Sequence, residues 1–190
     1  DCCDYICINI SSPNTPNLRD LHEKSKIEEL LTSIKLKQKT LNNKTPILLK
    51  ISPDISDANI SELSAIILQQ KIDGLVLTNT TITRDKDLIS LNKNEVGGLS
   101  GKPLAEVSNE IIKKFYSILK NEVPIIGAGG ITDGKTAFAK IKSGASLLQL
   151  YTSLVYEGPY VANKINEELE DLLQSEGYET LKDAVGKDCI

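Results

Sequence analysis

The sequence predicts an α/β fold built around a parallel β-sheet. Five short apolar segments recur along the 190 residues, and each is followed by a segment with helical periodicity. Strands and helices that alternate at spacings of tens of residues indicate a parallel sheet with right-handed crossovers. The apolar segments carry no polar face, which predicts a sheet covered on both sides. Two architectures stay open at this point, an open doubly wound sheet and a (β/α)8 barrel.

The first half of the chain supplies two strands and two helices. Residues 5–8 and residues 47–51 are short apolar runs and predict buried strands. Helices are expected at residues 24–38 and 57–70, because their apolar residues keep to one face. The expected inward positions are Ile27, Leu30, Leu31 and Ile34 in the first helix, and Ile60, Leu63, Ile66 and Ile67 in the second.

The second half repeats this pattern. Strands are expected at residues 72–77, 123–126 and 145–150, and a long loop at residues 84–102. Pro103 suits the first turn of a helix. That helix places Val107, Ile111, Phe115 and Leu119 at helical spacing, and further helices are expected at residues 133–143, 159–174 and 180–185.

Composition and charge exclude several classes of protein. With 40% hydrophobic residues, the chain can form one globular core and fits one domain. The 22 basic and 26 acidic residues give a net charge of −4 without a long run of either sign, which argues against a nucleic-acid surface. No window reaches the roughly 18–20 consecutive apolar residues of a membrane span. The chain opens on acidic residues and leads straight into a strand, so we expect it to be the middle of a longer protein.

The four cysteines form neither a metal-binding nor a disulfide pattern. Cys2 and Cys3 are adjacent, Cys7 lies in the first predicted strand, and Cys189 lies next to the end. The single histidine, His22, is not at ligand spacing from them. We therefore expect no metal site, and reduced, mostly buried thiols of the kind found in a reducing compartment.

Polar residues gather just after the predicted strands. Residues 9–16, Asn-Ile-Ser-Ser-Pro-Asn-Thr-Pro, place amides and hydroxyls after the first strand, and two prolines stop that strand. Similar clusters follow the third, fourth and fifth strands at residues 78–81, 127–130 and 151–153. In a barrel these strand ends meet on one face, where active sites form. Together the clusters predict a binding site, although the first one taken alone is equally consistent with a turn that satisfies its own backbone.

Two features indicate what this site would bind. Lys50 lies inside an apolar strand, where a cation is costly unless an anion neutralises it; the alternative is a lysine at the barrel edge that reaches solvent. Gly127, Gly129 and Gly130 allow backbone N–H groups to approach a phosphate, and residues 151–153 can begin a helix that adds donors. No His–carboxylate pair or Cys–His nucleophile is evident, so a cofactor is expected to supply the chemistry. A phosphate site with a lysine facing an electron sink suggests flavin mononucleotide (FMN).

Six motifs occur in the order found in dihydroorotate dehydrogenases. They are residues 9–16, 50–54 (Lys-Ile-Ser-Pro-Asp), 78–81 (Thr-Asn-Thr-Thr), 97–103 (Gly-Gly-Leu-Ser-Gly-Lys-Pro), 125–130 (Ile-Ile-Gly-Ala-Gly-Gly) and 149–151 (Gln-Leu-Tyr). Over essentially its whole length the chain resembles the quinone-dependent, class 2 enzymes. The resemblance implies a (β/α)8 TIM barrel with only about the last five β/α units present. Residues 1–190 would be the C-terminal part of a single FMN-binding barrel domain, without its N-terminal strands and membrane-associating helices.

The resemblance also implies a function. The family oxidises (S)-dihydroorotate to orotate with FMN and passes the electrons to a quinone, in de novo pyrimidine (UMP) biosynthesis. Association with the bacterial cytoplasmic membrane or the mitochondrial inner membrane would come from the N-terminal region. Ser12 stands where soluble class 1 relatives usually have cysteine, which favours quinone as the acceptor. The alternatives are a class 1 enzyme, another FMN barrel oxidoreductase, or an inactive fragment, and the isolated chain is expected to bind FMN poorly.

Roles for individual residues follow from the same resemblance. Ser12 would be the catalytic base that removes the C5 proton of the substrate while hydride leaves C6. Lys50 would stabilise negative charge on the reduced flavin. Residues 15–21 would form a lid, with Asn17 in place of a glycine common in relatives. The substrate would be bound by Asn9, Asn14, Asn79 and Thr80, and FMN by Asn9, Lys50, Thr78, Gly101, Gly130, Tyr151 and Thr152.

Overall fold

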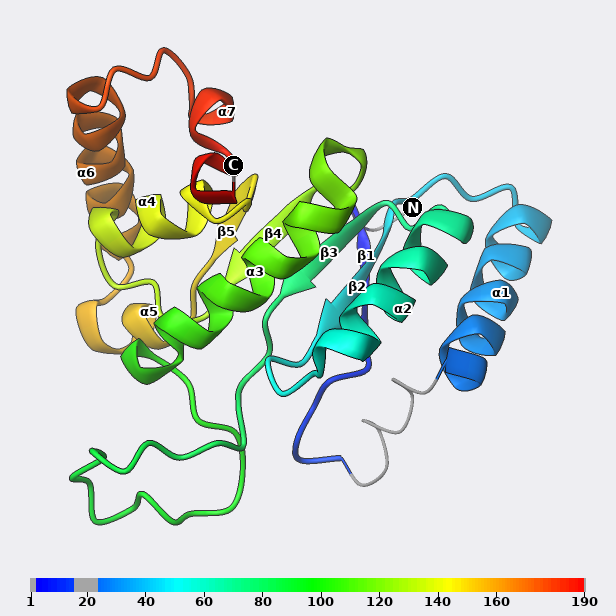
Figure 1. Cartoon of the computed structure of the whole chain (residues 1–190), viewed down its shortest axis with the longest axis horizontal. Coiled ribbons are helices and arrows are strands. Elements are labelled where there is room, and N and C mark those ends of the chain that lie inside the picture. Colours follow the sequence, from blue (N-terminus) through cyan, green and yellow to red (C-terminus); the bar gives the residue numbers. More distant parts are fainter. Residues whose placement is uncertain (1–2, 16–23, 190) are drawn as a thin grey trace.

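Five parallel strands form a single sheet in this computed structural model, which describes residues 3–15 and 24–189. The strands are β1 (Ile6–Asn9), β2 (Ile47–Ile51), β3 (Gly74–Leu77), β4 (Ile125–Ala128) and β5 (Leu147–Gln149). Their order in the sheet follows the chain, β1-β2-β3-β4-β5 (Figure 1). A doubly wound sheet reverses its strand order at a switch point. The unbroken order therefore settles the choice between the two predicted architectures, and the fold is a partial TIM barrel.

Helices join successive strands and lie over one face of the sheet. They are α1 (Lys24–Thr40), α2 (Asp57–Gln69), α3 (Ala105–Leu119) and α4 (Gly134–Lys142), followed after β5 by α5 (Thr152–Glu157), α6 (Val161–Ser175) and α7 (Leu181–Ala184). Neighbouring helices contact one another in the order α1, α2, α3, α4, α6 (Figure 1). Right-handed crossovers place every helix on the same side when the strand order does not reverse. The described helices therefore cover one face only. The prediction of a sheet covered on both sides is confirmed for β2 and β3, whose residues are buried on both faces, and fails for β1 and β5 at the edges.

The main core lies between the sheet and these helices. Ile27 and Leu31 are buried, Leu30 and Ile34 are partly buried against them, and all four inward positions predicted in α2 are buried. The prediction fails at one position of α3, because Val107 is 42% exposed. The helix turns Ser108 inward instead, and its side chain is fully buried.

Strand residues line the other face of the sheet. The register aligns Asn9, Lys50, Val76, Ile126 and Leu147 in one row across the five strands. Register partners in a parallel sheet project to the same side. A small apolar cluster of Leu48, Val76 and Ala128, with Cys7 and Ile126 against it, lies on this face. Lys50 and Asn9 extend from the same face, near the carboxyl ends of their strands.

Several boundaries differ slightly from the predicted ones. Strand β5 covers only Leu147–Gln149, and β3 begins at Gly74 because Ile72 precedes the first paired residue. Pro103 lies in a short 3-10 turn, Lys102–Leu104, so α3 itself begins at Ala105. Two further 3-10 turns cover Lys120–Glu122 and Lys187–Cys189.

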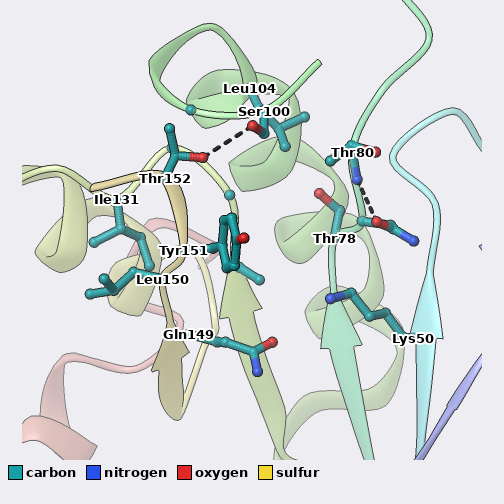
Figure 2. A pocket seen from close by; sticks show the side chains of 15 residues that line it. Lys50, Thr78, Thr80, Ser100, Leu104, Ile131, Gln149, Leu150, Tyr151 and Thr152 are labelled. Atoms are coloured by element: carbon teal, nitrogen blue, oxygen red, sulfur yellow. Dashed lines mark hydrogen bonds between the residues drawn. The ribbon is translucent and has the colours of Figure 1, made fainter. Parts of the chain in front are cut away.

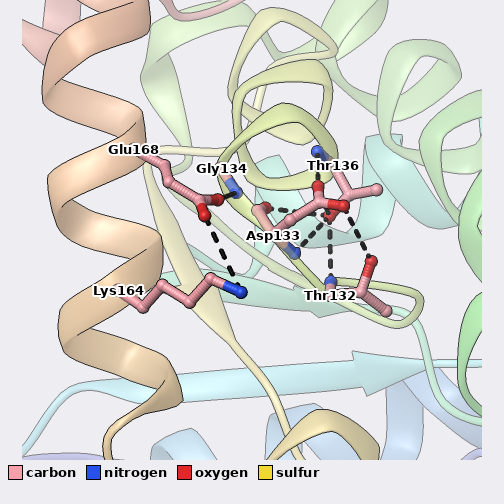
Figure 3. A network of polar contacts seen from close by, with 6 residues as sticks. All are labelled: Thr132, Asp133, Gly134, Thr136, Lys164 and Glu168. Carbon is pink, nitrogen blue, oxygen red and sulfur yellow. Dashed lines mark hydrogen bonds and ion pairs between the residues drawn. The ribbon is translucent and has the colours of Figure 1, made fainter. Parts of the chain in front are cut away.

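The N-terminus of α4 is fixed against α6 (Figure 3). Asp133 caps the helix: its carboxylate accepts the Thr136 N–H at 2.8 Å, and the Thr136 hydroxyl oxygen accepts the Asp133 N–H at 3.0 Å. The next amide, Gly134 N–H, donates to Glu168 Oε2 of α6 at 2.6 Å. Lys164 lies one turn before Glu168, with 3.9 Å between its Nζ and the carboxylate. Helix α4 is therefore held at a defined position behind β4 and β5.

Three of the four cysteines lie in the described residues and are free thiols. The expectation that the thiols are mostly buried is wrong, since Cys3 is exposed and Cys7 and Cys189 are only partly buried. Within residues 3–15 and 24–189, no helix has the length and apolarity needed to cross a bilayer. The predicted lid falls almost wholly in residues 16–23, outside the described part of the chain.

Candidate active site

The turn after β1 is tied to the end of β3 by side-chain hydrogen bonds. Asn9 Oδ1 accepts the Ser11 N–H at 3.2 Å and the Ser11 hydroxyl at 2.9 Å. Asn79 Nδ2 donates to Asn9 Oδ1 at 3.3 Å and to Ser11 Oγ at 3.0 Å. Ser11 is fully buried at the centre of this network. Ser11 was not among the predicted site residues, although a pair of adjacent serines inside a polar turn indicates that both could form functional hydrogen bonds.

Ser12 and Asn14 lie in the same turn, beside the loop that leads to α3. Ser12 Oγ accepts the Asn14 N–H at 3.3 Å, and Ser12 is half-buried while Asn14 is exposed. A Cβ atom on Gly98 would lie 1.8 Å from Thr80 Oγ1 and 3.0 Å from Pro13 Cγ, so only glycine fits there. The close approach brings the Ser12–Asn14 turn next to Thr80. Three of the residues predicted to bind substrate or remove its proton thus lie close together.

A cavity of about 390 Å³ opens at the carboxyl ends of β2 to β5 (Figure 2). Its volume falls in the range of roughly 300–1,000 Å³ typical of small-molecule sites. The lining residues are Lys50, Thr78, Asn79, Thr80, Ser100, Gly101, Leu104, Ala128, Gly129, Gly130, Ile131, Gln149, Leu150, Tyr151 and Thr152. Eight of the predicted site residues are in this set, whereas Asn9, Ser12 and Asn14 are outside it, at the neighbouring end of β1. Ser100, Leu104, Ile131 and Leu150 were not predicted, because only the folded chain brings these loop residues to the strand ends.

Lys50 supplies a cation to the cavity wall. Its side chain is half-buried and extends toward Thr78 (Figure 2). Among the described residues, no carboxylate forms an ion pair with its Nζ atom. Burial raises the pKa of the neighbouring Cys7 thiol, and the Lys50 charge partly opposes that rise. The cavity therefore presents a positive charge that suits an anionic or electron-rich ligand.

Thr78 contributes a hydroxyl that lacks a partner. The residue is 3% exposed, and within the described chain its buried Oγ1 atom forms no hydrogen bond. A buried hydroxyl without a partner destabilises the folded chain. Because Thr78 lines the cavity, this atom is placed to bond with a polar atom of a ligand.

The wall opposite Lys50 combines glycine backbone with the side chains of Ile131, Leu150 and Tyr151 (Figure 2). Gly130 has a φ of 74°, and a Cβ atom there would lie 2.4 Å from Ala105 Cα at the start of α3. On the other side, Thr152 begins α5 as predicted, and its hydroxyl donates to Ser100 Oγ at 3.0 Å. Tyr151 lies at the rim, with its side chain 78% exposed. Glycine backbone next to helix starts can form the kind of concave surface that binds phosphate.

Comparisons with known proteins agree with these features. A sequence profile of the family described as Dihydroorotate dehydrogenase matches residues 1–173. The chain is 42% identical to the Dihydroorotate dehydrogenase (quinone) of Parvibaculum lavamentivorans, over 97% of this chain and 52% of that protein. It is 41% identical to the mitochondrial Dihydroorotate dehydrogenase (quinone) of Mus musculus, over 97% of this chain and 47% of that protein. The chain thus spans about half the length of the curated relatives that it matches.

Solved structures show the same likeness. Ligand-free DHODH from Eimeria tenella superimposes with a TM-score of 0.93 at 35% sequence identity, over 97% of this chain and 56% of that one. DHODH from the same organism in complex with ferulenol gives a TM-score of 0.92 at 35% identity, over 97% of this chain and 54% of that one.

Proposed function

Because the chain belongs to the dihydroorotate dehydrogenase family, we propose that it carries the flavin site and part of the substrate site of an enzyme that oxidises (S)-dihydroorotate to orotate. The observation that carries this proposal is the single cavity lined by Lys50, by the Thr78 hydroxyl, which has no hydrogen-bond partner among the described residues, and by the backbone of Gly129 and Gly130. In this proposal FMN is the cofactor, and the enzyme serves de novo pyrimidine biosynthesis. A quinone is the proposed electron acceptor, supported by Ser12 and by the names of the relatives.

The described residues fit FMN. The bare backbone at Gly130 and the hydroxyl of Thr152 would hold the phosphate end, with Gly101 close to Thr152. Thr78 Oγ1 would gain the hydrogen-bond partner that it otherwise lacks. Lys50 would stabilise negative charge near its Nζ atom. Bound FMN would supply the two-electron acceptor, which none of the side chains in the cavity can provide.

Ser12 is the proposed base for the substrate C5 proton. A serine hydroxyl is a weak base at neutral pH, so its own proton has to pass to water or along a proton relay as Oγ takes up the C5 proton. The Asn14 N–H donates to Ser12 Oγ at 3.3 Å and would stabilise negative charge as it develops on that oxygen. Asn79 is held by Asn9 and Ser11, and its Oδ1 atom accepts the Thr80 N–H at 2.8 Å, which orients its amide for substrate.

The proposal includes a place in a larger barrel and at a membrane. Within the described residues β1 pairs only with β2, and β5 only with β4, so the sheet has two open edges that further strands could extend. The five β/α units would then be the C-terminal part of the FMN-binding domain. Membrane association would come from a segment N-terminal to them, at the bacterial cytoplasmic or mitochondrial inner membrane. The mitochondrial relatives support the second location.

Anaerobic flavin reduction tests the proposed function. Because the isolated chain is expected to bind FMN poorly, it is titrated with FMN in large excess, dihydroorotate is added without oxygen, and the long-wavelength flavin absorbance is followed. We expect bleaching that is lost in Ser12→Ala, with FMN still bound. Ser61→Ala, an exposed serine of α2 remote from the cavity, is the matched control and should bleach as the wild type does. FMN that binds without being reduced, or that does not bind, would refute the proposal for this chain.

A further inference from the structure

Lys140 is a buried lysine that lies outside the cavity and has no role in the proposed function. Lys140, on α4, is 1% exposed and is among the largest fully buried side chains of the described residues. No ion pair in the described chain includes it. A lysine is almost never fully buried without a partner. The neighbouring lysines of α4, Lys135 and Lys142, are exposed and half-buried, so the helix does not need a lysine to be buried.

The Lys140 ammonium donates to two side chains of α3. Its Nζ atom lies 2.9 Å from Ser108 Oγ and 2.8 Å from Asn109 Oδ1, and both residues are buried. An ammonium has no acceptor, so Ser108 Oγ must accept from it and send its own proton elsewhere. The Ser108 hydroxyl donates to Ala128 O at 2.7 Å. The charge on Lys140 therefore sets the direction of a hydrogen-bond chain that ends on the backbone of β4.

Packing around the lysine stem shows that the strand makes room for it. A Cβ atom on Gly127 would lie 2.7 Å from both Cγ and Cδ of Lys140, and 2.8 Å from Ala145 Cβ. The stem can cross from α4 to α3 behind β4 only because residue 127 lacks a side chain. Gly127 faces the helices rather than the cavity, since its register partners are Leu77 and Leu148. The missing side chain at Gly127 therefore leaves space for the Lys140 stem and does not open the cavity.

The hydrogen-bond chain that starts at Lys140 ends on a residue of the cavity wall, Ala128. Ala128 O accepts the Ser108 hydroxyl and also the Thr78 N–H, at 2.9 Å. Ala128 and Thr78 both line the cavity, and Gly129 and Gly130 follow directly. One carbonyl therefore joins the end of β3, the end of β4 and the first turns of α3.

We propose that Lys140 is a positioning residue, which acts through Ser108 and Ala128 to hold the Ala128–Gly130 turn and Thr78 in the geometry that binds the cofactor. Lys140 would hold the turn in place whether or not a ligand is bound. The effect of this positioning on FMN binding rests on the proposed function. Burial lowers the pKa of Lys140 to about 7, and Glu106 on α3 opposes this by favouring the charged form. The ammonium therefore has a substantial cost, which is consistent with its being retained for the hydrogen bonds it makes.

Amide hydrogen exchange on the unliganded chain tests the proposal. In Lys140→Met we expect exchange of the Thr78 N–H, which donates to Ala128 O at the end of the hydrogen-bond chain, to rise about tenfold, the effect of losing a hydrogen bond to a charged group. Exchange in β2 should stay unchanged. Lys135→Met removes an exposed lysine from the same helix and should change neither region. Ser108→Ala should reproduce the Lys140→Met result, and it provides the same test if Lys140→Met fails to fold.

The double variant Lys140→Met/Ser108→Ala distinguishes two models. In one, Lys140 acts on Ala128 through Ser108; in the other, Lys140 and Ser108 act independently. If Lys140 acts through Ser108, the double variant exchanges as fast as either single one; multiplied effects would overturn the proposal. A uniform rise that includes β2 would also overturn it, because it would show a loss of overall stability alone. FMN titration is the second readout, with weaker binding expected in both single variants. If the wild-type chain binds no FMN, the proposed function fails, while the exchange result still decides the role of Lys140.

Discussion

Replacing Thr78 by valine should change the stability of the free chain and its affinity for FMN in opposite directions. Valine keeps the shape of threonine and removes only the hydroxyl, whose oxygen is buried and lacks a hydrogen bond within the described chain. Leaving such a group unsatisfied costs about 1–3 kcal/mol. Thr78→Val should therefore raise the free energy of unfolding of the unliganded chain by up to that amount. It should also weaken FMN binding by about 5- to 30-fold, because the ligand loses one hydrogen bond worth about 1–2 kcal/mol.

Thr81 offers a matched control three residues further along. It is 4% exposed against 3% for Thr78, so the two sites have the same burial. Its hydroxyl, however, is hydrogen-bonded to the Asp54 carboxylate and accepts the Thr83 N–H at 3.0 Å. Thr81→Val should thus destabilise the chain by about 1–3 kcal/mol.

Urea unfolding followed by circular dichroism gives both stabilities, and flavin fluorescence gives both affinities. The reasoning would be refuted if Thr78→Val destabilised the free chain as much as Thr81→Val does. Unchanged FMN affinity in Thr78→Val would show instead that the hydroxyl does not bond to the cofactor.

Three further predictions concern other parts of the site. Gly130→Ala should cost about 2–5 kcal/mol in urea unfolding, from a strained positive φ and from overlap with Ala105; a loss below 1 kcal/mol would contradict the close approach. Lys50→Met should reduce affinity for reduced FMN more than for oxidised FMN, measured as a lower flavin reduction potential, and an unchanged potential would exclude a role for its charge. Because the pKa of Lys140 falls from 10.5 to about 7 on folding, the unfolded chain binds more protons between those values. The free energy of unfolding should therefore rise with pH across that window, by at most about 1.4 kcal/mol per pH unit, and Lys140→Met should remove this rise.

Sequence reasoning was most successful where a residue's role follows from its position along one strand. Lys50 is in the cavity wall because side chains alternate along β2 and its neighbours Leu49 and Ile51 face the core. The polar turns were found for a similar reason, since carboxyl ends of parallel strands share one edge. Such arguments need only the local pattern and the topology.

The residues that sequence reasoning missed depend on contacts between distant segments. Hydrophobicity selects Val107 for the inner face of α3, but a hydrogen bond to Ala128 O, twenty residues away, turns Ser108 inward. Lys140 and Lys142 look alike in the sequence, and nothing near them shows which one is buried. That choice is made by the missing side chain at Gly127 and by acceptors on α3, which belong to a different β/α unit.

The sequential strand order bears on how the chain folds. In the described sheet every strand pair joins neighbours along the chain, so no pairing has to close a loop longer than one β/α unit. The sheet can therefore grow by one unit at a time, as repeat proteins do. The cavity has walls from β2 to β5 and exists only when four units are in place. The strands and helices of the first units can therefore form before the cavity exists. The cofactor would bind only after most of the sheet has assembled.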